Sequence, residues 1–381
     1  MTAIENLFRY KTRSIVVILC LVAILLPFIT AMAISEGVKF QASVSVDHGA
    51  DIYVTKDNYG SNAPISLKFI DRLKILEGVL KVVPRVVGRT YFANRLVVIT
   101  GIVPENIPPD LTIIKGKLFQ KRGEVIIGKG LSEEFNLGAG VIFSLTQNPY
   151  ITFRVAGVFD ADLQNIWSSD MILMSFNDAS SFFLMEGMAT DILLYTRPGY
   201  AKKLAEKIQL DWAVSEKSSD PPLRVQDKSL VKRYFLRGYN YRAGVFTALY
   251  MVAFALAIPA ILVTSGFGLT ERRREIGVLK ATGWQTQDVL EMVGFENLLI
   301  SLTGAPLAIL LSILWLKVFN GAFIAQFFIA ELGLFSRFPV PSQFLPMPAI
   351  LGFVFAIILT MVGALYSTWK TSIIPPAEAM R

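Results

Sequence analysis

The sequence predicts a polytopic α-helical membrane protein with four transmembrane helices and a large mixed α/β extracytoplasmic domain between the first and second helices. Three observations support this fold class. The 381 residues are 53% hydrophobic, with a mean hydropathy of +0.51. Apolar runs of about 20 residues or more, long enough to cross a bilayer, recur along the chain. Charged residues, 18% of the total, are concentrated in one long block between the first two runs.

The apolar runs divide the chain into segments of alternating character. In order, these are an amino terminus at 1–13, a first span at 14–34, an outer domain at 35–241 with a stalk at 229–242, a second span at 243–269, a central loop at 270–288, a third span at 289–318, an outer loop at 319–345, a fourth span at 346–369 and a carboxyl terminus at 370–381. Lys and Arg in both termini and the central loop favour a cytoplasmic location for these parts. Ala31-Met32-Ala33 also fits a signal-peptidase site, but the length of the first run favours an uncleaved span.

The outer domain shows short, alternating apolar runs that are typical of a folded aqueous domain. Strands are predicted near residues 44–56, 79–91, 95–103, 123–127, 141–146, 151–159, 171–175 and 190–196, and helices near 66–76, 131–135 and 199–210. Asn94 is predicted to lie in the turn between the second and third strands. The Pro-rich segment 104–116 is predicted to be a linker that divides the domain into two lobes.

The residues indicate no catalytic, cofactor-binding or metal-binding site. Cys20 and His48 are the only residues of their types, so neither a disulfide nor a zinc site within the chain is expected. Gly123, Gly128 and Lys129 have the spacing of a phosphate-binding loop. However, Gly130 replaces the Ser or Thr of that motif, and the residues between the glycines are strand formers. The net charge of +7 is attributed to Lys and Arg that flank spans and contact lipid, and nucleic-acid binding is not expected.

Two segments next to the membrane stand out as candidate sites. The central loop combines apolar and charged residues at helical spacing, ending at a glycine, and its candidate residues are Glu271, Arg272, Arg273, Arg274, Glu275, Ile276, Leu279, Lys280 and Gly283. The stalk mixes aromatic residues with the bases Lys232, Arg233, Arg237 and Arg242. These bases suit either a helix that prolongs the second span or a contact with lipid headgroups, and the stalk is the favoured interpretation.

The spans themselves are uncharged near the middle of the membrane, which disfavours an ion-coupled transporter and indicates an external energy source. Small residues recur four apart on them, which predicts close helix packing within the chain or with a second copy. These residues are Ala253 and Ala257 on the second span, Gly304, Ala308 and Ser312 on the third, and Gly352 and Ala356 on the fourth.

Particular motifs carry a family resemblance. They are ERRREIGVLKATGW in the central loop, PAEAMR at the carboxyl end, and GEVIIGKGLSEEFNLGAGVIFSL and FRVAGVF in the outer domain. With the arrangement of the spans, these motifs resemble the FtsX-like permease family, more closely its macrolide-exporter and lipoprotein-release branch. The resemblance covers essentially the whole chain, and the central loop and outer-domain motifs are its most specific parts.

This resemblance implies a multi-pass subunit of the inner membrane that exports or extracts a hydrophobic or amphiphilic substrate by mechanotransmission. Residues 271–283 would form a coupling helix on a separate ABC ATPase, which would hold the ATP and Mg²⁺. A second permease copy or a homologue would complete the complex, and a periplasmic adaptor is left open as a partner. Unlike macrolide exporters, the chain carries no fused ATPase domain, so the substrate and partner stay open. The alternative is a signalling or scaffold subunit that regulates an extracytoplasmic partner, such as a cell-wall hydrolase, without transport.

Overall fold

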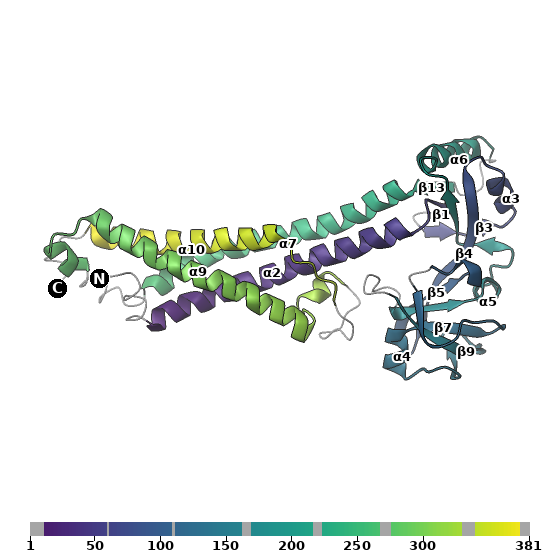
Figure 1. The fold of residues 1–381 in the computed structure, drawn as a ribbon, viewed down its shortest axis with the longest axis horizontal. Helices are drawn as coiled ribbons and strands as arrows, with labels where there is room; N and C mark the ends of the chain where they lie inside the picture. The colour runs from purple at the N-terminus through teal and green to yellow at the C-terminus, as the bar shows by residue number, and fades with distance from the viewer. Residues whose placement is uncertain are drawn as a thin grey trace. The chain divides into compact units, whose positions relative to one another are not determined.

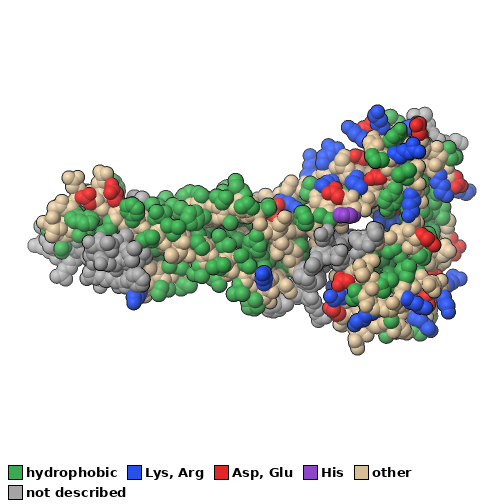
Figure 2. All heavy atoms as spheres, viewed as in Figure 1, with side chains coloured by type: hydrophobic (Ala, Val, Ile, Leu, Met, Phe, Trp, Pro, Cys, Tyr) green, Lys and Arg blue, Asp and Glu red, His purple; other side chains and the backbone are tan. Residues whose placement is uncertain are grey.

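A computed structural model describes residues 11–58, 61–108, 111–161, 169–215, 223–266, 276–329 and 340–373. The chain divides into two compact units. The helical unit contains Met1–Lys39 and Tyr239–Arg381, and the α/β unit contains Phe40–Gly238. Hydrophobic side chains cover most of the face of the helical unit seen in Figure 2, whereas Lys, Arg, Asp and Glu are frequent on the α/β unit.

Long apolar helices make up most of the helical unit (Figure 1). They are α2 at Lys11–His48, α7 at Lys228–Gly266, α9 at Thr286–Phe319 and α10 at Pro346–Ser372. Within the described residues, three helices are long and apolar enough to cross a membrane, at Ser14–His48, Lys228–Ile258 and Thr286–Phe319, and Pro346–Val362 is a shorter apolar helix. The structure thus supports several membrane helices, and the count of four stays a prediction.

Close packing of α2 against α9 and α10 depends on small residues. A Cβ atom added to Gly304 of α9 would lie 3.1 Å from Cδ1 of Leu21, and one added to Gly352 of α10 would lie 3.5 Å from Cδ1 of Ile29. Ala308 and Ala356 are fully buried. The predicted role of small residues is therefore confirmed for α9 and α10, where the backbone approaches its neighbours closely. On α7, Ala257 is buried but Ala253 is exposed.

Hydroxyl groups join the same helices by hydrogen bonds. Thr30 Oγ1 of α2 lies 2.6 Å from Ser312 Oγ of α9, and Ser301 Oγ of α9 lies 2.7 Å from Thr360 Oγ1 of α10. All four side chains are 1% exposed or less. In a lipid environment such bonds contribute about 0.6–2 kcal/mol each, so they add to the packing and fix the rotational setting of the helices.

A long mixed sheet forms the α/β unit, in the strand order β13-β1-β12-β4-β5-β10-β7-β9-β6. The bounds are β1 Ile52–Asn58, β4 Val79–Phe92, β5 Arg95–Gly101, β6 Leu111–Gly116, β7 Glu124–Gly128, β9 Asn148–Ala161, β10 Met171–Met174, β12 Asp191–Thr196 and β13 Leu223–Asp227. Shorter strands are β2 Ser61–Ala63 beside β1, β8 Ile142–Leu145 beside β9, and the separate pair β3 Ile65–Ser66 and β11 Met188–Ala189. The helices are α3 Phe69–Lys74, α4 Lys129–Phe135, α5 Phe176–Phe182 and α6 Ala201–Ser215.

Strand β4 belongs to both lobes of this sheet. Its first half pairs with β12 up to Arg85, and its second half pairs with β5 from Val86. Each lobe has its own buried cluster, one around Ile192 and Leu194 between β12, β1 and α6, and the other around Ile99 between β5, β7 and α5. The lobes therefore share one continuous strand, as Figure 1 shows.

Two predictions for this unit are wrong. Residues 44–48 continue helix α2 to His48, and the strand begins only at Ile52. The β-branched residues Val44 and Val46 suggested a strand, but extending an existing helix costs little compared with nucleating a new element. The linker predicted at 104–116 contains a 3₁₀ turn, η1 at Pro104–Asn106, and strand β6, which pairs with β9.

Other predicted elements agree with the structure within a few residues. The hairpin of β4 and β5 turns at Ala93 and Asn94, whose φ angles of 46° and 67° are those of a tight two-residue turn. The helix predicted at 66–76 is the shorter α3, and the helix predicted at 199–210 is α6, which continues to Ser215. The residues 229–242 predicted to form a stalk are helical and belong to α7.

Candidate coupling helix and stalk junction

The described part of the central loop begins with a short helix at residues 276–281. Ile276 is 2% exposed, Val278 is 50% exposed, and Leu279 and Lys280 are partly buried. Ile276 of the predicted apolar face is thus buried, but Ala281 of that face is exposed, so the described residues match the amphipathic pattern only in part. The preceding candidate residues, Glu271, Arg272, Arg273, Arg274 and Glu275, lie outside the described residues. We refer to residues 276–281 as the coupling helix, after the role that we propose for them below.

A glycine ends the coupling helix in the predicted place. Gly283 has a φ of +99°, in the left-handed region that favours glycine. Its N–H group donates to the carbonyl of Lys280 at 3.1 Å, and the N–H group of Trp284 donates to the carbonyl of Leu279 at 3.1 Å. This pair of bonds is the Schellman motif, which satisfies carbonyls that the end of a helix leaves free. The prediction that Gly283 ends the helix is confirmed.

Helix α9 begins at Thr286, only three residues after Gly283. A reciprocal capping box fixes its start, because Asp288 Oδ2 accepts from the backbone N–H of Gln285 at 2.8 Å and the Gln285 side chain accepts from the backbone of Asp288. The coupling helix and α9 thus meet at a joint with hydrogen bonds on both sides. Sequence analysis missed this joint because Gln is not a usual capping residue.

The end of α2 and the start of α7 meet in the α/β unit. Lys232 Nζ lies 2.6 Å from Asp47 Oδ2, and Lys228 Nζ lies 3.2 Å from Asp51 Oδ1. Lys228 Nζ also donates to the carbonyl of Asp47 at 3.0 Å, and the Lys228 N–H donates to the carbonyl of Asp51 at 2.8 Å. We call Asp47, Asp51, Lys228 and Lys232 the stalk junction. Lys232 and Asp47, which the junction joins, lie 185 residues apart in the sequence.

The predicted stalk residues fall into different environments. Lys232 is partly buried and paired with Asp47, whereas Arg233 and Arg237 are exposed on α7. Arg242 also lies on α7, and its side chain is outside the described ones. Sequence analysis missed Asp47 and Asp51, because an acidic partner that is distant in sequence leaves no local pattern. A contact of Arg233, Arg237 or Arg242 with lipid stays a prediction.

The segment with phosphate-loop spacing has a structural role. Glu124–Gly128 is strand β7 in the middle of the sheet, and Lys129 begins α4 directly. Lys129 Nζ lies 3.2 Å from Asp160 Oδ2. A strand in this position has no loop in which backbone N–H groups could surround a phosphate. Across the described ranges, His, Cys, Asp and Glu form no group of three with the proximity needed to hold a metal ion.

The fold defines a membrane protein with several apolar helices, an α/β domain and a short helix in the loop between two of the apolar helices. Comparison with protein families then identifies it. Residues 14–209 match the MacB-like periplasmic core domain, and residues 247–376 match the FtsX-like permease C-terminal domain. The chain belongs to this MacB-like and FtsX-like family of ABC transporter permeases, as its motifs suggested.

One curated relative is the lipoprotein-releasing system transmembrane protein LolC of Haemophilus influenzae, which is 22% identical over 269 residues. The alignment covers 68% of this chain and 65% of the relative, which is less than two thirds of that protein's length.

Two solved structures have some similarity to about half of the chain. The periplasmic region of MacB from Actinobacillus actinomycetemcomitans has 12% identity and a TM-score of 0.37, covering 50% of this chain and 95% of that one. The extracellular domain of the noncanonic ABC-type transporter YknZ, from Gram-positive bacteria, has 16% identity and a TM-score of 0.35, covering 47% of this chain and 99% of that one.

Proposed function

We propose that this chain is the membrane subunit of an ABC transport system that exports or extracts a hydrophobic or amphiphilic substrate. A separate ATPase subunit, which binds ATP and Mg²⁺, supplies the energy. The observation that carries the proposal is the coupling helix. It is an amphipathic segment between spans, inside the region that matches the FtsX-like permease domain, and it ends in a joint fixed by hydrogen bonds.

The ordered ends on either side of this joint support a mechanical role for the helix. The bonds at Gly283 and Trp284 order the end of the coupling helix, and the Gln285–Asp288 box orders the start of α9, so only a short connection separates two ordered ends. On this proposal, a displacement of the coupling helix moves that end of α9 with it. A slack loop would absorb the same displacement. Closure of an ATPase dimer against residues 271–283 is therefore the input that we propose, and the outer domain is the output. The substrate does not need a pore through the spans.

The orientation follows from the short loops. We place both termini and the central loop in the cytoplasm, the α/β unit outside, and four spans in the inner membrane. A second permease copy or a homologue completes the complex, with an extracytoplasmic adaptor as a further partner in systems that have one. The name of the relative from Haemophilus influenzae suggests a lipoprotein as one substrate to test.

Purification of the chain in its native complex, followed by mass spectrometry, tests for the ATPase. The complex should hydrolyse ATP, and a lipopeptide or lipoprotein substrate should accelerate hydrolysis. Activation of a cell-wall hydrolase without any transported molecule would instead favour the signalling alternative. Activity driven by an ion gradient without an ATPase would contradict the proposal.

Variants of the coupling segment test the mechanism. Arg273→Glu, Glu275→Arg and Leu279→Asp should abolish the stimulation of ATP hydrolysis by substrate while the protein stays inserted in the membrane. Lys203→Glu, at an exposed position on α6, is the matched control and should leave stimulation unchanged. Full stimulation in all three coupling variants would contradict a coupling role for this segment.

A further inference from the structure

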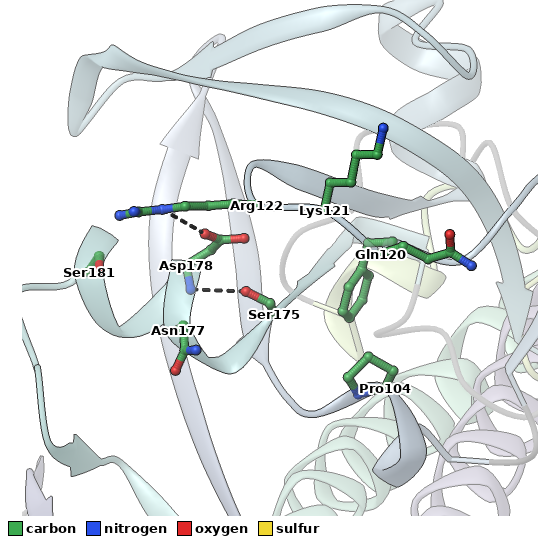
Figure 3. Close-up of a pocket in the computed structure, with 9 residues that line it drawn as sticks. Pro104, Gln120, Lys121, Arg122, Ser175, Asn177, Asp178 and Ser181 are labelled. Carbon is green, nitrogen blue, oxygen red and sulfur yellow. Dashed lines mark hydrogen bonds and ion pairs between the residues drawn. The ribbon is translucent and has the colours of Figure 1, made fainter.

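A pocket of about 470 Å³ lies in the α/β unit, in the lobe that contains β5, β7 and α5 (Figure 3). Residues from three chain segments line it. They are Pro104 of η1, Phe119, Gln120, Lys121 and Arg122 of the loop between β6 and β7, and Ser175, Asn177, Asp178 and Ser181 at and within α5. Binding sites for small molecules commonly have volumes of about 300–1,000 Å³, so the size suits a small ligand.

The loop that carries the two basic residues is fixed at both ends. Glu124 Oε2 accepts from the backbone N–H groups of Gln120 at 2.9 Å and Lys121 at 3.1 Å. These two bonds lower the pKa of Glu124 below its ordinary value. Asp178 Oδ2 accepts from the backbone N–H of Gly123 at 3.0 Å. The backbone of the loop is therefore ordered before any ligand arrives, which lowers the entropic cost of binding.

Asp178 is 8% exposed and is occupied by this structural role. Its backbone N–H donates to Ser175 Oγ at 3.1 Å, and its Oδ1 atom lies 3.7 Å from Nε of Arg122. Figure 3 shows the Arg122 side chain extending toward Asp178. The carboxylate thus orients one side of the guanidinium group, while the Arg122 side chain is 87% exposed and keeps further N–H donors available.

The charged residues that line the pocket are the cations Lys121 and Arg122 and the anion Asp178, and the charge of Lys121 also acts on the nearby Glu124 carboxylate. Lys121 is exposed, and no carboxylate in the described part of the chain lies within ion-pair distance of its Nζ. The amide groups of Gln120 and Asn177 and the hydroxyl group of Ser181 add neutral hydrogen-bonding groups. Phe119, 2% exposed, and Pro104 add an apolar surface. Two cations next to an apolar surface match an anion that carries an apolar group.

We infer that this pocket binds an organic anion, a phosphate or carboxylate attached to an apolar group, through Lys121 and Arg122. Arg122 and Lys121 contact the anionic group, and Phe119 and Pro104 contact the apolar part. The inference is independent of the ATPase, since it depends only on the α/β unit. A soluble phosphate ester and a lipid headgroup share this chemistry, and two probes distinguish them.

The test uses the full-length chain in phosphatidylcholine nanodiscs, which carry no net lipid charge, with empty nanodiscs as the blank. Isothermal titration calorimetry measures the affinity for phenyl phosphate and for dihexanoyl phosphatidic acid below its micelle concentration. Both should bind. Tighter binding of phenyl phosphate identifies a soluble ester as the source, and tighter binding of the short lipid identifies a headgroup. No binding of either probe beyond the blank would overturn the inference.

Substitutions in the pocket test whether the probes bind there. Arg122→Gln and Lys121→Gln should each weaken binding about tenfold, because each removes a hydrogen bond to a charged group. Both side chains are exposed, so folding should be unaffected. Asp178→Asn should strengthen binding, since it removes a negative charge 3.7 Å from the guanidinium group and keeps an oxygen acceptor for Gly123. Lys203→Gln, on an exposed face of α6, should change nothing. Equal affinity in the Arg122 and Lys121 variants and the unmodified chain would overturn the assignment.

Discussion

Lys232 Nζ lies 2.6 Å from Asp47 Oδ2 and so connects the beginning of α7 to the end of α2. The side chains are 34% and 50% exposed, and an exposed pair of this kind contributes only about 0.2–1 kcal/mol to stability. The ion pair matters more for position than for stability, because it holds together two helices that each also carry an apolar span. We expect movement of one helix at the stalk junction to be passed to the other.

Reversing the charge of Lys232 should impair the transmission of movement without a large loss of stability. We expect Lys232→Glu to reduce substrate-stimulated ATP hydrolysis by the complex while the melting temperature changes by only a few degrees. The double variant Asp47→Lys with Lys232→Glu should recover the stimulation. Arg233→Glu, the exposed neighbour on α7, is the control for a general effect of added negative charge. If the double variant is as impaired as the single one, the ion pair does not couple the helices.

Gly283 tests whether the end of the coupling helix must have a defined geometry. Its φ of +99° is strained for other residues, although an added Cβ would meet no atom within 4 Å. Replacement by Val should therefore act through backbone strain alone, at a cost of about 1–3 kcal/mol. Gly283→Asn should be tolerated better, because Asn adopts left-handed conformations more readily. The measurement is substrate-stimulated ATP hydrolysis, and equal activity of the Val and Asn variants would contradict the argument.

The sequence predicted those features that depend on local patterns. Apolar runs indicated the membrane helices, and Gly283 indicated the end of the coupling helix. The turn at Asn94 was also predicted from local residues. Each of these follows from the conformational preference or hydropathy of neighbouring residues. The family resemblance added the role that we propose for the central loop, which local patterns could not supply.

Features that depend on distant pairing were missed. The strand β6 was mistaken for a linker, because its segment contains Pro and Gly and its stability comes from pairing with β9, about 45 residues later. The acids Asp47 and Asp51 were not matched with Lys228 and Lys232 for the same reason. The pocket combines residues of η1, the β6–β7 loop and α5, which lie far apart in the sequence, so no local pattern indicated it.

Thr30 and Ser312 offer a direct test of the packing of α2 against α9. Their hydroxyl oxygens lie 2.6 Å apart, so two cysteine sulfurs at these positions should approach bonding distance. In a Cys20→Ser background, which removes the only native cysteine, the pair Thr30→Cys with Ser312→Cys should form a disulfide under mild oxidation. A shift in gel mobility that is reversed by reductant measures it.

The control for this crosslink uses the same helix. Thr303 is exposed on α9, and the pair Thr30→Cys with Thr303→Cys should not crosslink within one chain. A crosslink between two chains would have twice the mass and would be recognised on the gel. Failure of the Thr30 and Ser312 pair to crosslink, in protein that is inserted and oxidised, would contradict the predicted contact.

The outer domain should lose stability in alkaline solution through Tyr53. This side chain lies near the ion pair in which Arg85 Nε donates to Asp191 Oδ1 at 3.0 Å. Burial raises the pKa of Tyr53 above its ordinary value of 10.0, and the positive charge of Arg85 offsets only part of that shift. The folded state therefore retains the phenol proton at a pH where the unfolded chain releases it. The stabilisation is complete below the unfolded pKa and is lost as pH rises through the folded pKa.

Thermal unfolding of the full-length chain between pH 8 and pH 11 measures this effect. The melting temperature should fall above about pH 10, and Tyr53→Phe should reduce the slope, since one ionising group is removed. Burial also raises the pKa of Tyr195, which is still present in this variant, so a reduced slope is expected and a flat curve is not. Tyr150→Phe is the matched control, because Tyr150 is 95% exposed. If Tyr53→Phe and Tyr150→Phe give the same slope, burial of Tyr53 does not contribute to the alkaline limit.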